Sequence, residues 1–273
     1  MSKSVIDANI EVHTRMVERY DGEEPHFRSE NQEKVRARLK VLRARVPGGR
    51  LLDVGCGTGF IIHLAADLFD EIHGVDITPA MMARVRRDKG NITLHQSRAE
   101  DMPFPDASFD AVTAYSFLDH VEDMGALLRE VARVLKPGGV FYADLAPHRD
   151  FWRALSELDN ADSGGLSDIV LREAAMVAEN DKKVEQQFGI EAETFRRAEP
   201  GKEAGGIDPV EFHDVALRSG FSTCEATYDW YLGQGAVMHG QSFADSAVVE
   251  AYLRRTLPLT KHLFKYVYFH AVR

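Results

Sequence analysis

Three glycines at alternate positions, Gly55, Gly57 and Gly59, follow a short apolar run that contains Asp53. Glycine adopts positive φ at little cost and lets a ligand approach the backbone. The apolar run at 51–54 is typical of a buried parallel strand, and helical periodicity resumes after the third glycine. The spacing is not the G-x-G-x-x-G of dinucleotide sites, because Phe60 occupies the position of the last glycine. The segment therefore predicts a ligand-binding turn between strand and helix, and a glycine turn without a ligand is the alternative.

A second candidate for chemistry is Asp76, which ends the next predicted strand. Ligands of open α/β sheets bind outside the carboxyl ends of the strands. A carboxylate there can accept hydrogen bonds from both hydroxyls of a ribose. An aspartate at a strand end is by itself more often a cap or turn residue. Together with the glycine turn about 20 residues upstream, the pattern favours the ribose interpretation.

The elements that must position these residues alternate between strand and helix, which predicts a parallel sheet covered on both faces. Two helices are expected before residue 46, with a break at 21–25. Strands are expected at 50–54, 71–76, 92–95, 109–115, 140–144, 221–230 and 263–273. Helices are expected at 60–68, 79–87, 124–135, 208–220 and 242–257.

The alternation of predicted strands and helices, and its interruption after residue 150, divide the chain into four parts. We expect N-terminal helices that cover the ligand site at 1–46, the ligand-binding core at 47–150, a helical lid at 151–207 and the last part of the core at 208–273. The third part is charged and mostly helical, and it interrupts the alternation.

Four segments between Arg50 and Leu145 carry a family resemblance: L-L-D-V-G-C-G-T-G, G-V-D-I-T, A-E-D-M-P-F-P-D-A-S-F-D and L-K-P-G-G. Together they closely resemble class I S-adenosylmethionine-dependent methyltransferases, in particular the small-molecule subgroup that includes quinone-biosynthesis enzymes. The resemblance implies an α/β fold: a Rossmann-like, mostly parallel seven-stranded sheet with an antiparallel last strand, helices on both faces and a helical cap. It also implies S-adenosylmethionine as cofactor, S-adenosylhomocysteine as product, and a small-molecule methyl acceptor.

The resemblance places the methionine and ribose parts of the cofactor. Asp76 would hold the ribose hydroxyls, and Tyr20 and Arg28 would contact the cofactor carboxylate. The methionine part would lie beside Asp53, Gly55, Cys56, Gly57 and Gly59.

The same resemblance places the adenine. Ile77 and Met81 would pack against the ring, while Ala99 and Glu100 would face its edge. Many family members have aspartate where this chain has Arg98, so we assign the contact with the adenine amino group to Glu100.

The sulfonium end of the cofactor should lie where the fourth strand ends, beside Tyr115 and Ser116. The Asn/Asp-Pro-Pro-aromatic signature of N-methyltransferases is absent there, which disfavours the exocyclic amines of nucleic-acid bases as acceptors.

A catalytic base is needed only if the acceptor must lose a proton, as a phenol or alcohol must. Histidine suits this role because imidazole titrates near neutral pH. His120 is the candidate base, and the alternative is a loop residue that packs on the cofactor or caps the next helix. Asp144 and His148 are weaker candidates of the same kind. The acceptor pocket is expected to include Phe117, His120, Phe151, Trp152 and Phe195, although these aromatic residues could equally form the core of the lid.

Composition limits the possible partners. The formal net charge is −10, whereas proteins that bind phosphate backbones usually carry a basic stripe. No Cys/His cluster suggests a metal site, and no apolar run approaches the roughly 20 residues of a membrane span. We therefore expect a cytoplasmic monomer or homodimer with no metal, nucleic-acid or membrane partner. Two alternatives remain: a regulatory or scaffolding protein that binds S-adenosylmethionine or S-adenosylhomocysteine without turnover, and a protein or RNA methyltransferase.

Overall fold

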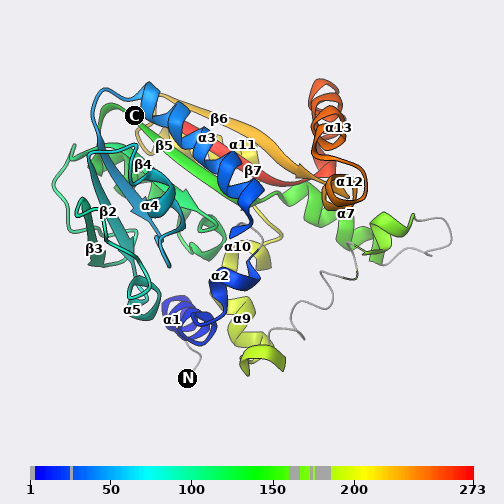
Figure 1. Ribbon diagram of the computed structural model, residues 1–273, viewed down its shortest axis with the longest axis horizontal. Helices are drawn as coiled ribbons and strands as arrows, with labels where there is room; N and C mark the ends of the chain where they lie inside the picture. The colour runs from blue at the N-terminus through cyan, green and yellow to red at the C-terminus, as the bar shows by residue number, and fades with distance from the viewer. Residues whose placement is uncertain (1–3, 25–26, 160–166, 173–174, 176–185) are drawn as a thin grey trace.

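The computed structural model, shown in Figure 1, describes residues 4–24, 27–159, 167–172, 175 and 186–273. The strands of this part of the chain form one seven-stranded sheet in the order β3-β2-β1-β4-β5-β7-β6, in which β7 runs antiparallel to both neighbours. The strands are β1 (Arg50–Val54), β2 (Glu71–Asp76), β3 (Ile92–Gln96), β4 (Phe109–Tyr115), β5 (Leu135–Pro147), β6 (Thr223–Tyr231) and β7 (Phe264–Val272). The predicted Rossmann-like sheet with an antiparallel last strand is confirmed.

Helices follow the strands in the predicted alternation. The N-terminal helices are α1 (Val5–Met16), α2 (Tyr20–Glu23) and α3 (Ser29–Arg45). The central ones are α4 (Phe60–Ala65), α5 (Pro79–Met82), the 3-10 turn η2 (Leu118–His120) and α6 (Met124–Val134). The later ones are α7 (Arg149–Asp159), α9 (Ala192–Ala198), α10 (Pro200–Glu203), α11 (Pro209–Arg218), α12 (Gln234–Gly240), α13 (Phe243–Arg255) and the 3-10 turn η3 (Lys261–Leu263).

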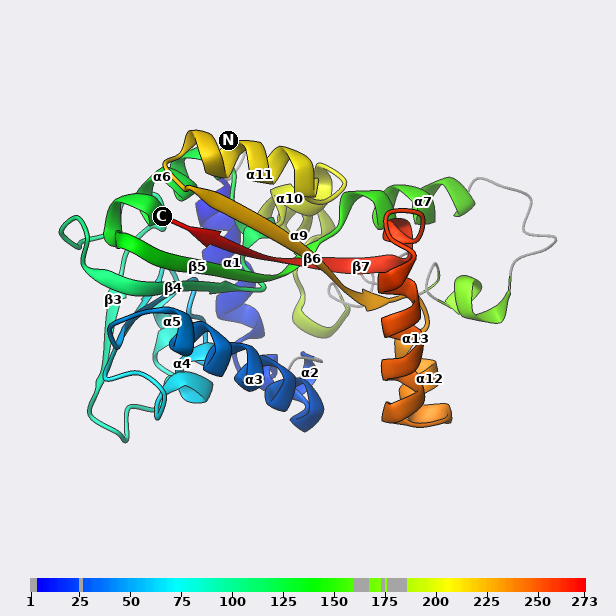
Figure 2. The ribbon, with the colours of Figure 1, turned by 90° about the horizontal axis from the view of Figure 1, so that it is seen from above.

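Each face of the sheet buries its own apolar layer, and Figure 2 shows the helices on both sides. On one face, Leu39 of α3 and Ile62 of α4 are completely buried in a single cluster. On the other face, Leu128 of α6 lies in a second cluster with Phe212 of α11, whose ring stacks on Phe269 at 3.9 Å. Burial on both faces explains why the central strands are continuous apolar runs.

Two helix starts follow from capping. Asp123 accepts a hydrogen bond from the backbone N–H of Ala126 at 2.8 Å, and Asp208 accepts one from Val210 at 2.8 Å. These bonds satisfy backbone donors that the first helical turn leaves without partners. Both helices therefore begin where the sequence predicts.

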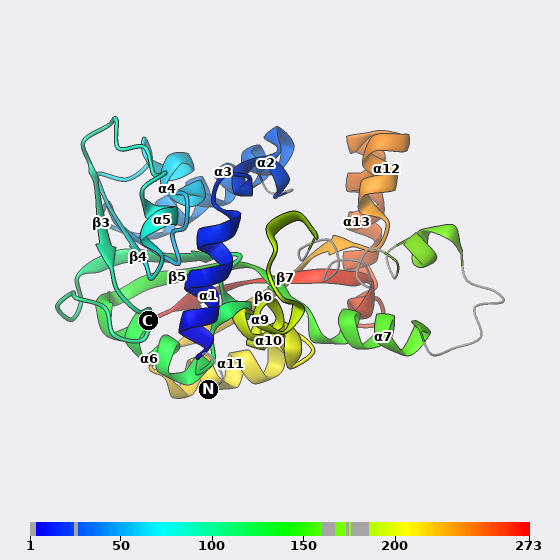
Figure 3. The same ribbon diagram turned by 90° about the horizontal axis from the view of Figure 1, so that it is seen from below.

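Two boundaries differ from expectation because of tertiary contacts. The predicted helix at 79–87 ends at Met82, and the backbone N–H of Arg86 donates instead to Nε2 of His63 at 3.1 Å. The fifth strand begins at Leu135 and not at residue 140. Gly138 donates to the carbonyl of Arg273 at 2.9 Å, which extends the pairing beyond the predicted turn. Helix α12, at the end of the molecule away from β3, was not predicted (Figure 3).

Helix α1 is held by α9 through a third, smaller apolar cluster, and the two helices lie side by side in Figures 1 and 3. Ala8 and Val12 of α1 pack there with Phe195 and Ala198 of α9. The predicted lid is described only in part, since residues 160–166, 173–174 and 176–185 lie outside the described residues. None of the helices in the described ranges combines the length and apolarity that crossing a bilayer requires.

Candidate functional site

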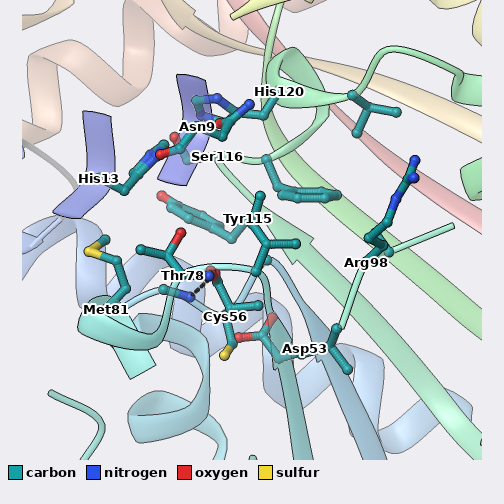
Figure 4. Close-up of a pocket in the computed structure, with 18 of the residues that line it drawn as sticks. Asn9, His13, Asp53, Cys56, Thr78, Met81, Arg98, Tyr115, Ser116 and His120 are labelled. Carbon is teal, nitrogen blue, oxygen red and sulfur yellow. Dashed lines mark hydrogen bonds between the residues drawn. The ribbon is translucent and has the colours of Figure 1, made fainter. Parts of the chain in front are cut away.

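A pocket lies at the carboxyl ends of β1, β2 and β4, where an open α/β sheet binds its ligands. Figure 4 shows side chains that converge on it from opposite walls. Most of the site residues predicted from the sequence line this pocket: Tyr20, Asp53, Gly55, Cys56, Gly57, Asp76, Ile77, Met81, Ala99, Glu100, Tyr115, Ser116, Phe117 and His120.

The glycine turn forms the first wall. Gly55 has a φ of 68°, and a Cβ there would lie 2.1 Å from the ring of Phe117. Gly57 has a φ of 50°, but a Cβ there would meet only the Cε of Met81 at 3.6 Å. Gly55 is therefore required by packing, whereas Gly57 keeps a wall of the pocket open for a ligand to approach the backbone.

Asp76 stands at the end of β2 and braces the glycine turn. Its Oδ2 accepts the backbone N–H of Gly57 at 2.8 Å, and its Oδ1 accepts the N–H of Thr78 at 2.7 Å. Burial raises the pKa of this carboxyl, while the two backbone hydrogen bonds oppose the shift. A carboxylate offers about four lone-pair positions, so capacity remains for hydroxyl donors from a ligand.

Asp53 of β1 lies deeper, with 2% of its surface exposed. Its Oδ1 accepts a hydrogen bond from the hydroxyl of Thr113 at 2.8 Å. Burial raises its pKa to about 7, and the nearby Asp76 adds to the effect. This carboxyl therefore titrates near neutral pH, and a cationic ligand group beside it would favour the ionised form.

The side of the pocket predicted to face adenine has mixed polarity. Met81 and Ala99 are buried, while Arg98 and Glu100 lie at the pocket with Arg98 Nε 3.5 Å from Glu100 Oε2. Arg98, which replaces the aspartate of many family members, thus contacts Glu100, to which we assign the adenine amino group.

The wall opposite the glycine turn comes from α1 and η2, and it carries two histidines (Figure 4). The rings of His13 and His120 meet edge to face, with centroids 5.0 Å apart. Nδ1 of His13 lies 2.9 Å from the carbonyl of Asn9, and Nδ1 of His120 lies 2.8 Å from the carbonyl of Ala198. Because a carbonyl can only accept, both Nδ1 atoms carry hydrogen, and in each neutral ring Nε2 is the nitrogen that can take a proton.

Burial and the neighbouring His120 lower the pKa of His13 to about 4. His13 is therefore neutral at pH 7.

His120 also belongs to a group of ionisable side chains beside the pocket. We call this group the site cluster, and it consists of Asp119, His120, Glu199 and Lys202. The ammonium of Lys202 lies 2.6 Å from Glu199 Oε1 and 3.4 Å from Asp119 Oδ2. Atoms of Asp119, His120 and Glu199 lie within 4.8 Å of one another, and the ammonium of Lys202 is ion-paired with both carboxylates. Asp119 Oδ1 is buried without a hydrogen-bond partner.

Five predicted site residues do not line the pocket. Arg28 is an exposed residue that immediately precedes α3, and Gly59 immediately precedes α4. Phe151 and Trp152 contact each other on α7, and Phe195 packs between α9 and α1. Their roles in binding remain predictions, and the last three have the core-packing environment that we weighed as the alternative.

The weaker base candidates also lie away from the pocket lining. Asp144 is paired with Arg38 at 2.7 Å, and His148 is completely buried with Nδ1 3.0 Å from the carbonyl of Phe264. Neither carries a side chain into the pocket wall.

Several residues of the pocket were not predicted. Val5, Asn9 and His13 lie on one face of α1 at intervals of four residues, and all three line the pocket. Residues four apart lie on the same face of a helix, so the sequence alone could have grouped these three residues. Thr58 also lines the pocket, and its hydroxyl donates to Asp21 of α2 at 2.6 Å, which ties the glycine turn to the N-terminal helices.

The sequence comparisons agree with this geometry. Residues 52–143 match the family described as "Methyltransferase domain". A probable S-adenosylmethionine-dependent methyltransferase of Mycolicibacterium smegmatis is 35% identical over 100 residues, which are 37% of this chain and 39% of the relative. A ubiquinone biosynthesis O-methyltransferase of Xanthomonas campestris is 36% identical over 38% of this chain and 47% of the relative. The chain thus spans less than half the length of these curated relatives.

Solved structures share the fold. Phosphoethanolamine N-methyltransferase 2 of Haemonchus contortus, solved with phosphomonomethylethanolamine and S-adenosylhomocysteine, superposes with a TM-score of 0.59 at 17% identity. The match covers 100% of this chain and 60% of that chain. An identity this low supports the shared architecture only.

Proposed function

We propose that this chain, whose residues 52–143 belong to the class I S-adenosylmethionine-dependent methyltransferases, transfers a methyl group to an oxygen, nitrogen or carbon of a small-molecule metabolite. One observation carries the proposal: the glycine turn and Asp76 face His120 across a single pocket. The first wall has the features of a nucleoside site, and the second offers a group that can take a proton.

The pocket residues fit S-adenosylmethionine, which supplies a methyl group already activated on a sulfonium sulfur. Asp76 has lone pairs left for two ribose hydroxyls, and Gly57 leaves the backbone accessible where a side chain would fill the space. Asp53 would lie by the methionine part, where its ionised form favours an ammonium group. Met81 and Ala99 would form the apolar part of the adenine site.

The protein's main contribution to methyl transfer would be positioning, since an in-line displacement depends on the approach of the acceptor atom. His120 would accept the proton of a hydroxyl acceptor through Nε2, because its Nδ1–H is held by the carbonyl of Ala198. The helices α1 and α2 would cover the bound cofactor, since Asn9 and Tyr20 line the pocket from above the glycine turn.

The first test is calorimetric titration of the purified chain with S-adenosylmethionine and with S-adenosylhomocysteine. We expect micromolar binding of both, and Asp76→Ala should weaken it by about 1–3 kcal/mol through loss of hydroxyl hydrogen bonds. Asp88→Ala is the matched control, because Asp88 is an exposed carboxylate outside the pocket. Folded protein that binds neither compound would contradict the proposal, and unchanged affinity in Asp76→Ala would contradict the ribose assignment.

The second test separates turnover from binding. Once an acceptor is found by screening, His120→Ala should slow methylation of a hydroxyl group and leave cofactor affinity unchanged. A wild-type rate in this variant would remove His120 as the base. Tight cofactor binding without turnover on any acceptor would favour the regulatory or scaffolding alternative.

A further inference from the structure

The carboxylate of Asp119 combines deep burial with an incomplete set of hydrogen bonds. Only 4% of the residue is exposed, and Oδ1 has no hydrogen-bond partner. The histidine nitrogen near this oxygen is Nε2 of His120, at 3.9 Å. A buried acceptor without a donor is costly, so such atoms in a folded protein call for an explanation.

The neighbouring segments fix both residues of this pair. Gly201 of α10 packs directly against η2, and a Cβ there would lie 2.8 Å from the Cα of Asp119. Lys202 holds the other oxygen of Asp119 at 3.4 Å, and the carbonyl of Ala198 holds Nδ1 of His120 at 2.8 Å. Ala198 at the end of α9 and Gly201 and Lys202 of α10 thus fix the imidazole ring and the carboxylate in one arrangement.

We propose that Asp119 is a positioning residue for His120: the negative charge of its carboxylate, with Oδ1 3.9 Å from Nε2, stabilises the imidazolium that forms when His120 takes a proton from the acceptor. This inference rests on the proposed function, in which His120 is the base. It gives a role to Asp119, which lies outside the pocket lining and acts when His120 becomes protonated. Lys202 and Gly201 keep Asp119 within reach.

The charge balance of the reaction explains why a carboxylate belongs there. The O–H bond of the acceptor breaks as the Nε2–H bond forms, and an electron pair of the oxygen forms the bond to the methyl carbon. The electron pair of the broken S–CH3 bond stays on sulfur, so the positive charge passes from sulfur to the imidazole. A fixed negative charge beside the imidazole stabilises the state in which this charge develops.

Other charged and titratable groups lie around the pair of His120 and Asp119, and they come from several elements. These groups are His13 of α1, Tyr20 of α2, Glu24 at the end of α2, Asp76 of β2, Glu199 and Lys202 at α10, and Tyr266 of β7. Burial opposes ionisation of Asp119, but His120 and Lys202 outweigh it and lower the pKa of this carboxyl. Asp119 is therefore ionised at neutral pH.

The experiment is an NMR titration of the His120 ring in the full chain, with EDTA present and with His120→Gln used for assignment. In Asp119→Asn the midpoint of His120 protonation should move about 1 pH unit lower, the size expected when an opposite charge within about 4–6 Å is removed. Glu122→Gln is the control, because it removes an exposed carboxylate two residues along the chain and should shift the midpoint much less. An unchanged or higher midpoint in Asp119→Asn would overturn the proposal.

A second measurement needs no variant and covers the case in which Asp119→Asn fails to fold. In a crystal structure of the wild-type chain at low pH, Oδ1 should stay beside Nε2 near the present 3.9 Å, because the neighbouring segments fix both groups. A carboxylate turned away from the ring, beyond the range of about 4–6 Å over which opposite charges stabilise each other, would contradict the proposal. Neither measurement requires cofactor or acceptor, so this inference and the proposed methyl transfer can fail independently.

Discussion

Two groups of ionisable side chains each combine acidic and basic residues, but they differ in how completely their carboxylates are hydrogen-bonded. The site cluster beside the pocket leaves one oxygen of Asp119 without a hydrogen bond. A second group, which we call the inner cluster, consists of Lys34, Arg38, Asp144 and Asp229 and ties α3 to β5 and β6.

In the inner cluster every carboxylate oxygen has a donor. Asp144 accepts from Arg38 at 2.7 Å, from the hydroxyl of Tyr142 and from the N–H of Leu145 at 2.7 Å. Asp229 accepts from Lys34 at 2.6 Å and from Arg38 at 2.7 Å. A carboxylate whose oxygens are all hydrogen-bonded within the protein is occupied, whereas Asp119 keeps an oxygen that can interact with another group. We therefore read the inner cluster as structural and the site cluster as functional.

The largest expected effect is on stability, and it separates the two clusters. Asp229→Asn removes the carboxylate that pairs with Lys34 and leaves the mostly buried Arg38 with Asp144 in place of two carboxylates, which should lower the free energy of unfolding by about 3–5 kcal/mol. Asp119→Asn removes a carboxylate with one oxygen unpaired, so the loss should be smaller, about 1–2 kcal/mol. Urea denaturation at pH 7 measures both. Equal losses would show that the oxygen of Asp119 without a hydrogen bond does not make this carboxylate less important for stability.

Acidification should lower stability through His13, whose ring contacts His120 of the site cluster. The pKa of His13 is about 4 in the folded chain, below its ordinary value of 6.5, so the unfolded chain binds more protons between these two values. Its contribution to stability is therefore present above pH 6.5 and is lost as pH falls through this range. Between pH 7 and pH 5 the contribution of His13 alone should fall by on the order of 1–2 kcal/mol.

His13→Gln is the control for this prediction, and urea denaturation at both pH values is the measurement. The variant should lose less stability than the wild type over the same pH interval, because glutamine does not titrate. The prediction is wrong if the two proteins respond to acid alike.

The smallest expected effect concerns the glycine-turn wall. Burial raises the pKa of Asp53 to about 7, so the free protein holds this carboxyl mostly protonated at pH 6 and mostly ionised at pH 8. If the cofactor's ammonium group requires the ionised form, affinity for S-adenosylhomocysteine should rise about tenfold from pH 6 to pH 8. Calorimetry of the wild type and of Asp53→Asn measures this rise, which should be absent in the variant. A rise of the same size in both would rule out Asp53 as its source.

The first wall of the pocket could be predicted from the sequence because its signals are local. Asp53, the glycine turn and Asp76 lie within one strand-turn-helix-strand unit, and short connections between parallel strands bring the strand ends to one edge. The second wall could be predicted only in outline. His120 was a candidate because it follows the fourth strand, whereas Asn9 and His13 were missed although their spacing marks one helical face.

By itself, the sequence determined the order of strands and helices, the positive-φ turn at Gly55–Gly59 and the carboxylates at the strand ends. Each of these features depends on the conformational preferences and the periodicity of residues that are close together in the chain. Only the tertiary structure decided that Lys202 and Glu199 meet Asp119 and that His13 meets His120. Those contacts join residues about 80 to 110 positions apart, and they depend on how α1, α9 and α10 pack, which no local pattern specifies. The same dependence explains why Asp144, a weaker base candidate that also follows a strand, is paired with Arg38 and does not line the pocket.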